Sequence, residues 1–126
     1  MNRQSPKVRH IRVWNEHGEM ESGGGATIAY REVEDGTAEF SVAYCSPQDN
    51  FNKATGRLVA SGKLNSRLHR CKTEMTLNDF EEELNELQKD DYWSNSMLAH
   101  ELCDTIGADI PGAYITDSRP AYATLR

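Results

Sequence analysis

The residues best able to bind a charged ligand lie within positions 46–64. A serine–proline pair opens this segment, as is typical of a helix start, and the free N–H groups of a first helical turn attract anions. Asn52 adds an amide, and Lys53 and Arg57, four residues apart, share one face of the expected helix. The planar guanidinium of an arginine suits bidentate contact with phosphate. The segment therefore predicts a helix that binds an anion.

Charge is segregated along the 126-residue chain, whose net charge is -6. Positions 50–72 carry six basic residues and no acid, whereas positions 73–117 carry twelve acids and a single base, Lys89. Two interpretations remain open: the basic segment pairs with the acidic helices across a solvated surface, or it receives an anion such as phosphate. A long polyanion would be repelled by the acidic part, and the pI of about 5.2 is unlike that of nucleic-acid-binding proteins. We therefore expect a small anionic ligand and no polymeric nucleic acid.

Catalytic and metal-binding motifs are not evident in the sequence. It contains no GxSxG, HExxH or Walker pattern, and the three glycines at 23–25 predict a loop and lack a nucleotide fingerprint. The odd number of cysteines, without CxxC spacing, argues against disulfides and for a reducing compartment. A zinc site could be drawn only from scattered residues without a closely spaced cysteine pair. We expect no catalysis, no metal and no cofactor; the residues of that hypothetical zinc site are Cys45, His69, Cys71, His100 and Cys103.

The N-terminal third predicts three strands. Residues 7–15 alternate, with Ile11 and Val13 on one face and His10, Arg12 and Trp14 on the other. Residues 26–34 and 38–45 alternate as well, and the Asp-Gly pair between them is a strong hairpin signal. These runs form an expected three-stranded antiparallel meander.

The remaining two-thirds of the chain predicts about three helices. The first is expected from Pro47 to about Leu64, with Ser46 as its N-cap. Its apolar stripe is Phe51, Ala54, Leu58 and Gly62. Glycines at 56 and 62 weaken a helix, which indicates close packing against another backbone.

The second helix is capped by Thr76, and its apolar stripe is Phe80, Leu84 and Leu87. The third opens at Ser94 and ends at Gly107. Its expected inward residues are Met97, Leu98, Leu102 and Ile106.

This order of elements predicts an α+β fold, in which an N-terminal three-stranded antiparallel sheet precedes about three helices. We expect one domain over residues 1–126, loose at 1–6 and in the C-terminal tail. No run approaches a membrane span and no signal-peptide core follows Met1, so a soluble intracellular protein is expected. Only 37% of residues are apolar and the mean hydropathy is -0.73, which suggests that a partner copy completes the core.

The pattern Asp49-Asn50-Phe51-Asn52-Lys53, Gly56-Arg57, Ala60 and Gly62-Lys63-Leu64 resembles a motif of small phage proteins. Together with size and element order, it resembles the first-described family of Thoeris anti-defence proteins over roughly residues 26–106. That resemblance implies a non-catalytic phage sponge in the cytoplasm of an infected bacterium. Family members form hexamers and sequester immune signals, namely cyclic ADP-ribose isomers and, at separate sites, the cyclic trinucleotides of CBASS defence.

The resemblance transfers one ligand contact to this sequence, Arg57. Lys53 and Asn52 join it through their position in the same segment. Four further candidates match only by residue type: Arg31, Trp93, Asn95 and Arg119. The three-glycine stretch and the long acidic segment have no counterpart in the family pattern.

Two other functions remain alternatives. The acidic segment could mimic nucleic acid and occupy a basic site on a host protein, which would make the chain a protein–protein inhibitor. A phage enzyme that alters a nucleotide is the third hypothesis.

Overall fold

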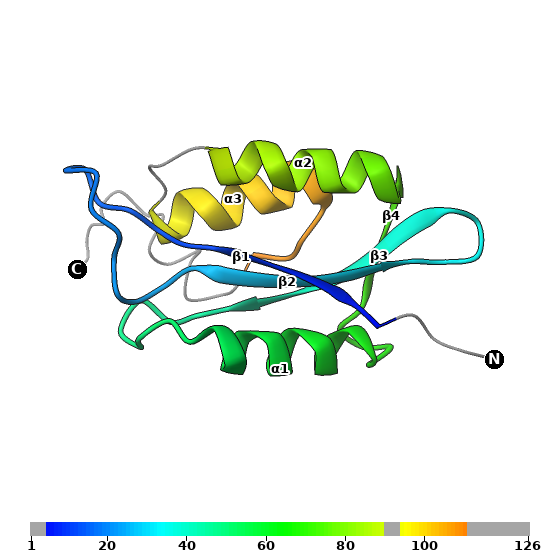
Figure 1. Cartoon of the computed structure of the whole chain (residues 1–126), viewed down its shortest axis with the longest axis horizontal. Coiled ribbons are helices and arrows are strands. Elements are labelled where there is room, and N and C mark those ends of the chain that lie inside the picture. The colour runs from blue at the N-terminus through cyan, green and yellow to red at the C-terminus, as the bar shows by residue number, and fades with distance from the viewer. Residues whose placement is uncertain (1–4, 90–93, 111–126) are drawn as a thin grey trace.

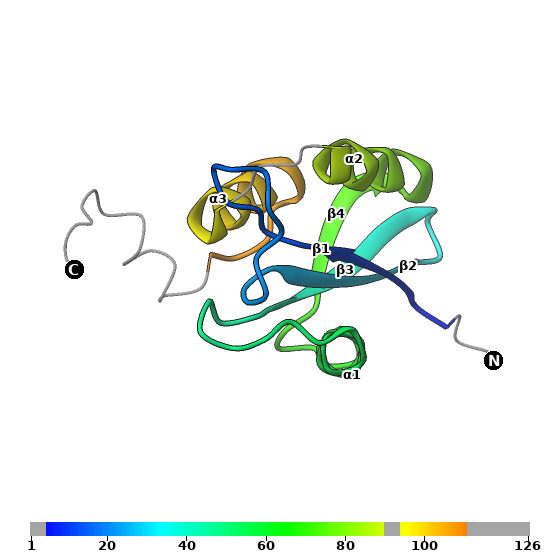
Figure 2. The same ribbon diagram turned by 60° about the vertical axis from the view of Figure 1, so that its left-hand side comes forward.

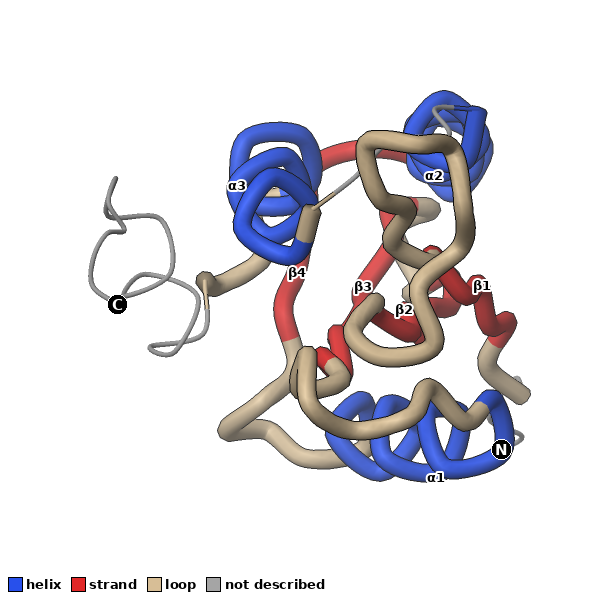
Figure 3. The backbone as a smooth tube through the Cα atoms, turned by 90° about the vertical axis from the view of Figure 1, so that its left-hand side faces the viewer, coloured by secondary structure: helices blue, strands red, loops and turns tan. Residues whose placement is uncertain are grey.

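A four-stranded antiparallel sheet is covered by one helix on one face and by two helices on the other (Figure 1). This computed structural model describes residues 5–89 and 94–110. Along the sheet the strand order is β1-β2-β3-β4, and Figures 2 and 3 show α1 on the face opposite to α2 and α3. The fold is therefore α+β, as the sequence predicts. The elements are β1 (Lys7–Ile11), β2 (Ala26–Glu32), β3 (Thr37–Tyr44), α1 (Lys53–Leu64), β4 (Cys71–Thr76), α2 (Leu77–Lys89) and α3 (Asn95–Ile106).

The expected hairpin joins β2 and β3. Gly36 has a φ of 89°, and the Asp35 carboxylate accepts a 3.0 Å hydrogen bond from the Thr37 backbone N–H. The central strand β2 is buried along nearly its whole length, because helices cover both faces of the sheet. Both faces of this strand are therefore buried, and the alternation of its residue types does not separate a solvent-exposed face from a buried one.

The prediction of three strands is wrong by one, because the structure adds β4 beside β3. The register pairs Thr37 with Thr76 and Phe40 with Cys71, with a shift between them. Burial alternates along β4, yet its inward side chains are Cys71, Thr73 and Met75. None of these is a strongly apolar strand former, so the period-2 signal is faint in the sequence.

The predicted start of α1 is also wrong. The helix begins at Lys53, and its N-cap is Asn52, whose side-chain oxygen accepts a 2.9 Å hydrogen bond from the Thr55 N–H. Before it, Gly23 forms a β-bridge with Asn50, and the N–H of residue 51 bonds to a carbonyl of the 22–25 loop. A backbone already paired in extended form cannot enter a helix.

The buried face of α1 consists of Gly56, Ala60 and Leu64. The expected stripe is wrong, since Leu58 is 75% exposed. A Cβ on Gly56 would collide with the Thr27 side chain, so this glycine does allow close packing of helix on strand. The same expectation fails at the second glycine, Gly62, where a Cβ would meet nothing within 4 Å.

The second helix begins after the predicted cap, and the third both begins and ends as predicted. Thr76 accepts a hydrogen bond from the Asp79 N–H and Ser94 from the Met97 N–H, and Gly107 ends α3 with a φ of 82°. Their buried side chains pack with β1, β2 and β3 into the main core. Met97 departs from the expectation, because it is 41% exposed. The buried helix residues are Phe80, Leu84, Leu87, Leu98, Leu102 and Ile106.

Within the part of the chain that the structure describes, no helix combines the length and hydropathy that crossing a bilayer requires. The expected loose ends lie mostly outside the described residues, at 1–4 and 111–126.

Candidate ligand-binding site

Three cations gather around one histidine on the β1 side of α1. His10 lies on β1 and Arg12 just beyond its end, while Lys53 and Arg57 come from the first turns of α1. Burial, followed by the positive charges of Arg57, Lys53 and Arg12, holds the pKa of His10 below its ordinary value. We call His10, Arg12, Lys53 and Arg57 the cation cluster.

The aromatic ring of Phe51 forms a wall of this cluster. It lies edge-on to the His10 ring at a centroid distance of 5.6 Å. The Arg12 guanidinium carbon stands 4.6 Å from the centroid of the same ring, in cation–π contact. Arg12 is also anchored by a 2.9 Å hydrogen bond to the Glu21 carbonyl. The cluster is thus held in place at its β1 end.

Two buried nitrogens of the cluster have no hydrogen-bond partner among the described protein atoms: Nε2 of His10 and Nε of Arg12. The other ring nitrogen of His10, Nδ1, lies 2.9 Å from the Thr27 hydroxyl. Buried polar atoms are nearly always paired, so two such atoms in one cationic place point to an acceptor from outside the chain. An oxyanion supplies acceptors and the matching charge.

The charge pairing that the sequence left open does not form at Lys53 and Arg57. The sheet separates α1 from the acidic helix α2 (Figure 3). Among the described residues, the ion pairs of lysine and arginine join Lys7 to Glu81, and Arg31 and Arg70 to Glu39. Lys53 and Arg57 are both exposed, and neither takes part in these pairs. Their charges remain available to a ligand.

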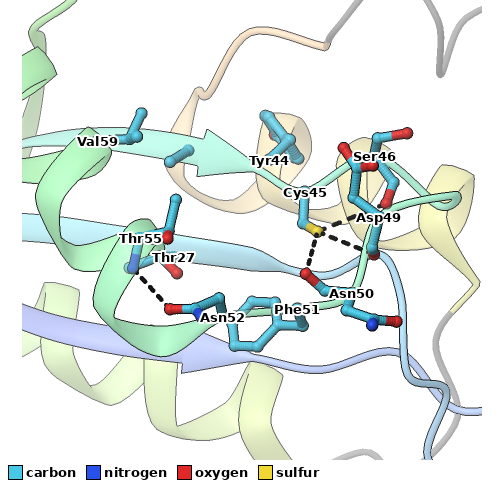
Figure 4. Close-up of a pocket in the computed structure, with 12 residues that line it drawn as sticks. Thr27, Tyr44, Cys45, Ser46, Asp49, Asn50, Phe51, Asn52, Thr55 and Val59 are labelled. Atoms are coloured by element: carbon cyan, nitrogen blue, oxygen red, sulfur yellow. Dashed lines mark hydrogen bonds between the residues drawn. The ribbon is translucent and has the colours of Figure 1, made fainter.

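A pocket with a volume of about 240 Å³ lies on the β3 side of the same helix end (Figure 4). Phe51 and Asn52 line it, and so do the end of β3 and the loop that follows. The Cys45 thiol is held there by the carbonyl oxygens of Asp49 and Ser46, at 3.4 and 3.5 Å. We call this cavity the loop pocket. Its lining is uncharged apart from Asp49: Thr27, Ala43, Tyr44, Cys45, Ser46, Asp49, Asn50, Phe51, Asn52, Thr55, Gly56 and Val59.

Two residues predicted to contact ligand make contacts within the fold. Arg31 is buried and forms a 2.7 Å ion pair with Glu39, and it also donates to the Asn65 side chain at 3.1 Å. Asn95 accepts a 3.1 Å hydrogen bond from the Gly25 N–H, which ties α3 to the three-glycine loop.

The other predicted site residues fall into three places. Lys53 and Arg57 lie in the cation cluster, while Asn52 caps α1 and lines the loop pocket. Trp93 and Arg119 lie outside the described residues.

The sequence analysis did not identify His10 and Arg12 as site residues, although they share the face of their strand opposite to Ile11.

No metal centre assembles in the described residues. No three histidine, cysteine or carboxylate side chains come together there as metal ligands. The scattered zinc candidates therefore do not converge within residues 5–89 and 94–110, and the free thiols Cys45, Cys71 and Cys103 are each half-buried.

No family model matches the chain, and neither the curated proteins nor the solved structures contain a significant match to it.

Proposed function

We propose that this protein binds a small nucleotide and sequesters it without chemistry. The observation that carries the proposal is the placement of the cation cluster and the loop pocket, whose lining is uncharged apart from Asp49, on two sides of Phe51. A nucleotide has the matching division into a charged phosphate part and a flat, hydrogen-bonding ring. Sequestration requires only tight and stoichiometric binding.

The cation cluster is the half that would hold phosphate. Lys53 and Arg57 are exposed and project from the first two turns of α1, next to the N–H groups that favour negative charge. A charge-assisted hydrogen bond contributes roughly 1.5–3 kcal/mol. Two or three such contacts amount to about 3–9 kcal/mol, against about 8 kcal/mol for micromolar binding, so contacts to the rest of the ligand have to supply the remainder and offset the ordering cost.

The loop pocket is the half that would hold the base. Its amides and hydroxyls can pair with ring nitrogens and exocyclic groups, and Phe51 offers a face for stacking. In this proposal the ligand is an ADP-ribose-type or cyclic nucleotide. The motif resemblance to Thoeris anti-defence sponges extends the proposal to a phage protein that blocks bacterial defence in the host cytoplasm.

Calorimetry against a panel of nucleotides tests the proposal. The panel consists of ADP-ribose, a cyclic ADP-ribose isomer and a cyclic trinucleotide. Arg57→Ala should lower affinity about tenfold or more, which matches the loss of one charged contact. Arg57→Glu should lower it further, while Glu82→Ala on α2, behind the sheet, should bind as the parent does. Equal binding by the parent and Arg57→Glu would contradict the proposed site.

Heating the complex and analysing the released nucleotide separates sequestration from catalysis. Intact nucleotide is expected, whereas an altered one would favour the enzyme hypothesis. A chain that binds no nucleotide but captures a basic host protein would favour the acidic inhibitor.

We also propose that the protein works as a homo-oligomer, with a hexamer as the form implied by the resemblance. Two large apolar side chains on the α1 side, Leu58 and Leu68, are 75% and 90% exposed. A second copy could cover them, since oligomer interfaces bury such residues. Light scattering at micromolar concentration checks this, and a monodisperse monomer of 14.2 kDa would refute it.

A further inference from the structure

We infer that His10 takes up a proton when a phosphate group binds the cation cluster, so that affinity rises as the pH falls. The inference rests on the proposed function, because it requires an anion at this site. It adds His10, which the sequence motif does not contain, and a dependence of ligand affinity on pH.

The hydrogen bonding of His10 leaves one nitrogen ready for a ligand. Its Nδ1 lies 2.9 Å from the Thr27 hydroxyl, which can either donate or accept. In either tautomer the buried Nε2 has no protein partner among the described residues. Only a protonated ring donates from both nitrogens at once, to the hydroxyl on one side and to an acceptor on the other.

The groups facing His10 make the imidazolium unfavourable until an anion arrives. Arg12 faces it from just beyond the end of β1, Lys53 and Arg57 face it from α1, and Thr27 and Phe51 are uncharged. Burial and these cations lower the pKa of His10, so the ring is neutral near pH 7 in the free protein. A bound phosphate offsets the three positive charges and accepts from Nε2, which raises the pKa.

Arg12 supplies a second donor for the same oxyanion. It stands two residues from His10, so both side chains leave the same face of the sheet edge, and its Nε is the other buried nitrogen without a partner. Both nitrogens are covered in this conformation. Phe51 contacts both side chains, and a ligand reaches the two nitrogens only after side chains around them shift.

Linkage sets the sign and the size of the effect. Between the pKa of the free protein and the higher pKa of the complex, each binding event takes up as much as one proton. Affinity then increases by up to about tenfold for each pH unit of decrease. Below the pKa of the free protein both forms are protonated, and the affinity levels off.

ADP-ribose is the probe, because its phosphates are esterified and lack the second ionisation near pH ~6 of a phosphate monoester. Calorimetry from pH 8 to pH 5, in two non-phosphate buffers with different ionisation enthalpies, counts the protons taken up. We expect net uptake near neutral pH and affinity that rises toward lower pH. Binding without proton uptake at any pH would overturn the inference and leave the proposed function standing. No binding of any panel nucleotide at any pH would overturn both.

His10→Gln and His17→Gln form the matched pair of variants. Glutamine keeps a hydrogen-bonding side chain but cannot titrate, and His17 lies in an exposed loop with 73% of its side chain accessible. His10→Gln should lose the proton uptake and the pH dependence, whereas His17→Gln should keep both. If a folded His10→Gln variant still takes up a proton on binding, the proton goes to another group and the inference is refuted. NMR titration of the His10 ring in the parent, with and without ADP-ribose, measures the two pKa values directly and needs no variant. Equal values would refute the inference.

Discussion

Replacing Arg31 by alanine should lower the melting temperature of the protein markedly, and it should do so in the absence of any ligand. The Arg31 side chain is only 7% accessible, and its Nε donates to the Glu39 carboxylate at 2.7 Å. The same guanidinium donates to Asn65, so removal takes one hydrogen bond from an exposed amide and leaves the buried Glu39 carboxylate without its main cation. Arg70 lies 3.8 Å from Glu39 and replaces only part of the lost charge.

The expected size follows from the burial of the pair. Breaking a buried ion pair by removing one partner costs about 3–5 kcal/mol. For a domain of this length each kcal/mol lowers Tm by roughly 3–6 °C, so Arg31→Ala should melt about 10–25 °C below the parent. Exposed Arg57→Ala should stay within about 0.5 kcal/mol of the parent.

Thermal and urea unfolding, followed by circular dichroism, measure both variants. A double variant, Arg31→Met with Glu39→Met, should recover most of the loss, since an apolar pair of similar volume leaves no buried charge. If Arg31→Ala melts within about 2 °C of the parent, a large contribution of the buried pair to stability is refuted. In that case the prediction that Arg31 contacts ligand would regain support.

Three further predictions concern α1 and the alkaline stability of the fold. Gly56→Ala should destabilise by about 1–3 kcal/mol because its Cβ would collide with the sheet, whereas Gly62→Ala should stabilise by up to about 1 kcal/mol, and urea unfolding compares the two. Asn52→Ala should lower the free energy of unfolding by about 1 kcal/mol because it removes the N-cap of α1, while Ser46→Ala should lower it by less than about 0.5 kcal/mol. The reverse order would favour the helix start at Pro47 that the sequence predicts. Burial and a hydrogen bond to the Glu81 carboxylate raise the pKa of Tyr30 to about 12. The free energy of unfolding should therefore fall as the pH rises from about 10 to about 12. Tyr30→Phe should remove that part of the pH dependence.

Local signals predicted those elements whose boundaries depend on their own neighbours in the chain. The Asp-Gly turn before Thr37, the cap at Thr76 and the cap at Ser94 all work through hydrogen bonds within three residues. The apolar stripe of α2 repeats with a helical period and has one face to bury. Such elements can be read from the sequence because nothing distant competes for their backbone.

Elements that depend on distant partners could not be predicted this way. The start of α1 moves to Lys53 because Gly23 pairs with Asn50, and β4 exists because β3 offers it an edge. Arg31 is likewise held by a distant partner, because Glu39 lies opposite it on the neighbouring strand and forms an ion pair with it.

The same distinction applies to the residues of the candidate site. The sequence by itself determined that Lys53 and Arg57 share a helix face in a stretch without acids. Only the tertiary structure decided that His10 and Arg12 complete their cluster, because α1 packs on β2 through Gly56 and brings β1 beside it. Periodicity reports which face of an element is buried, but the partner that covers this face is chosen by long-range packing.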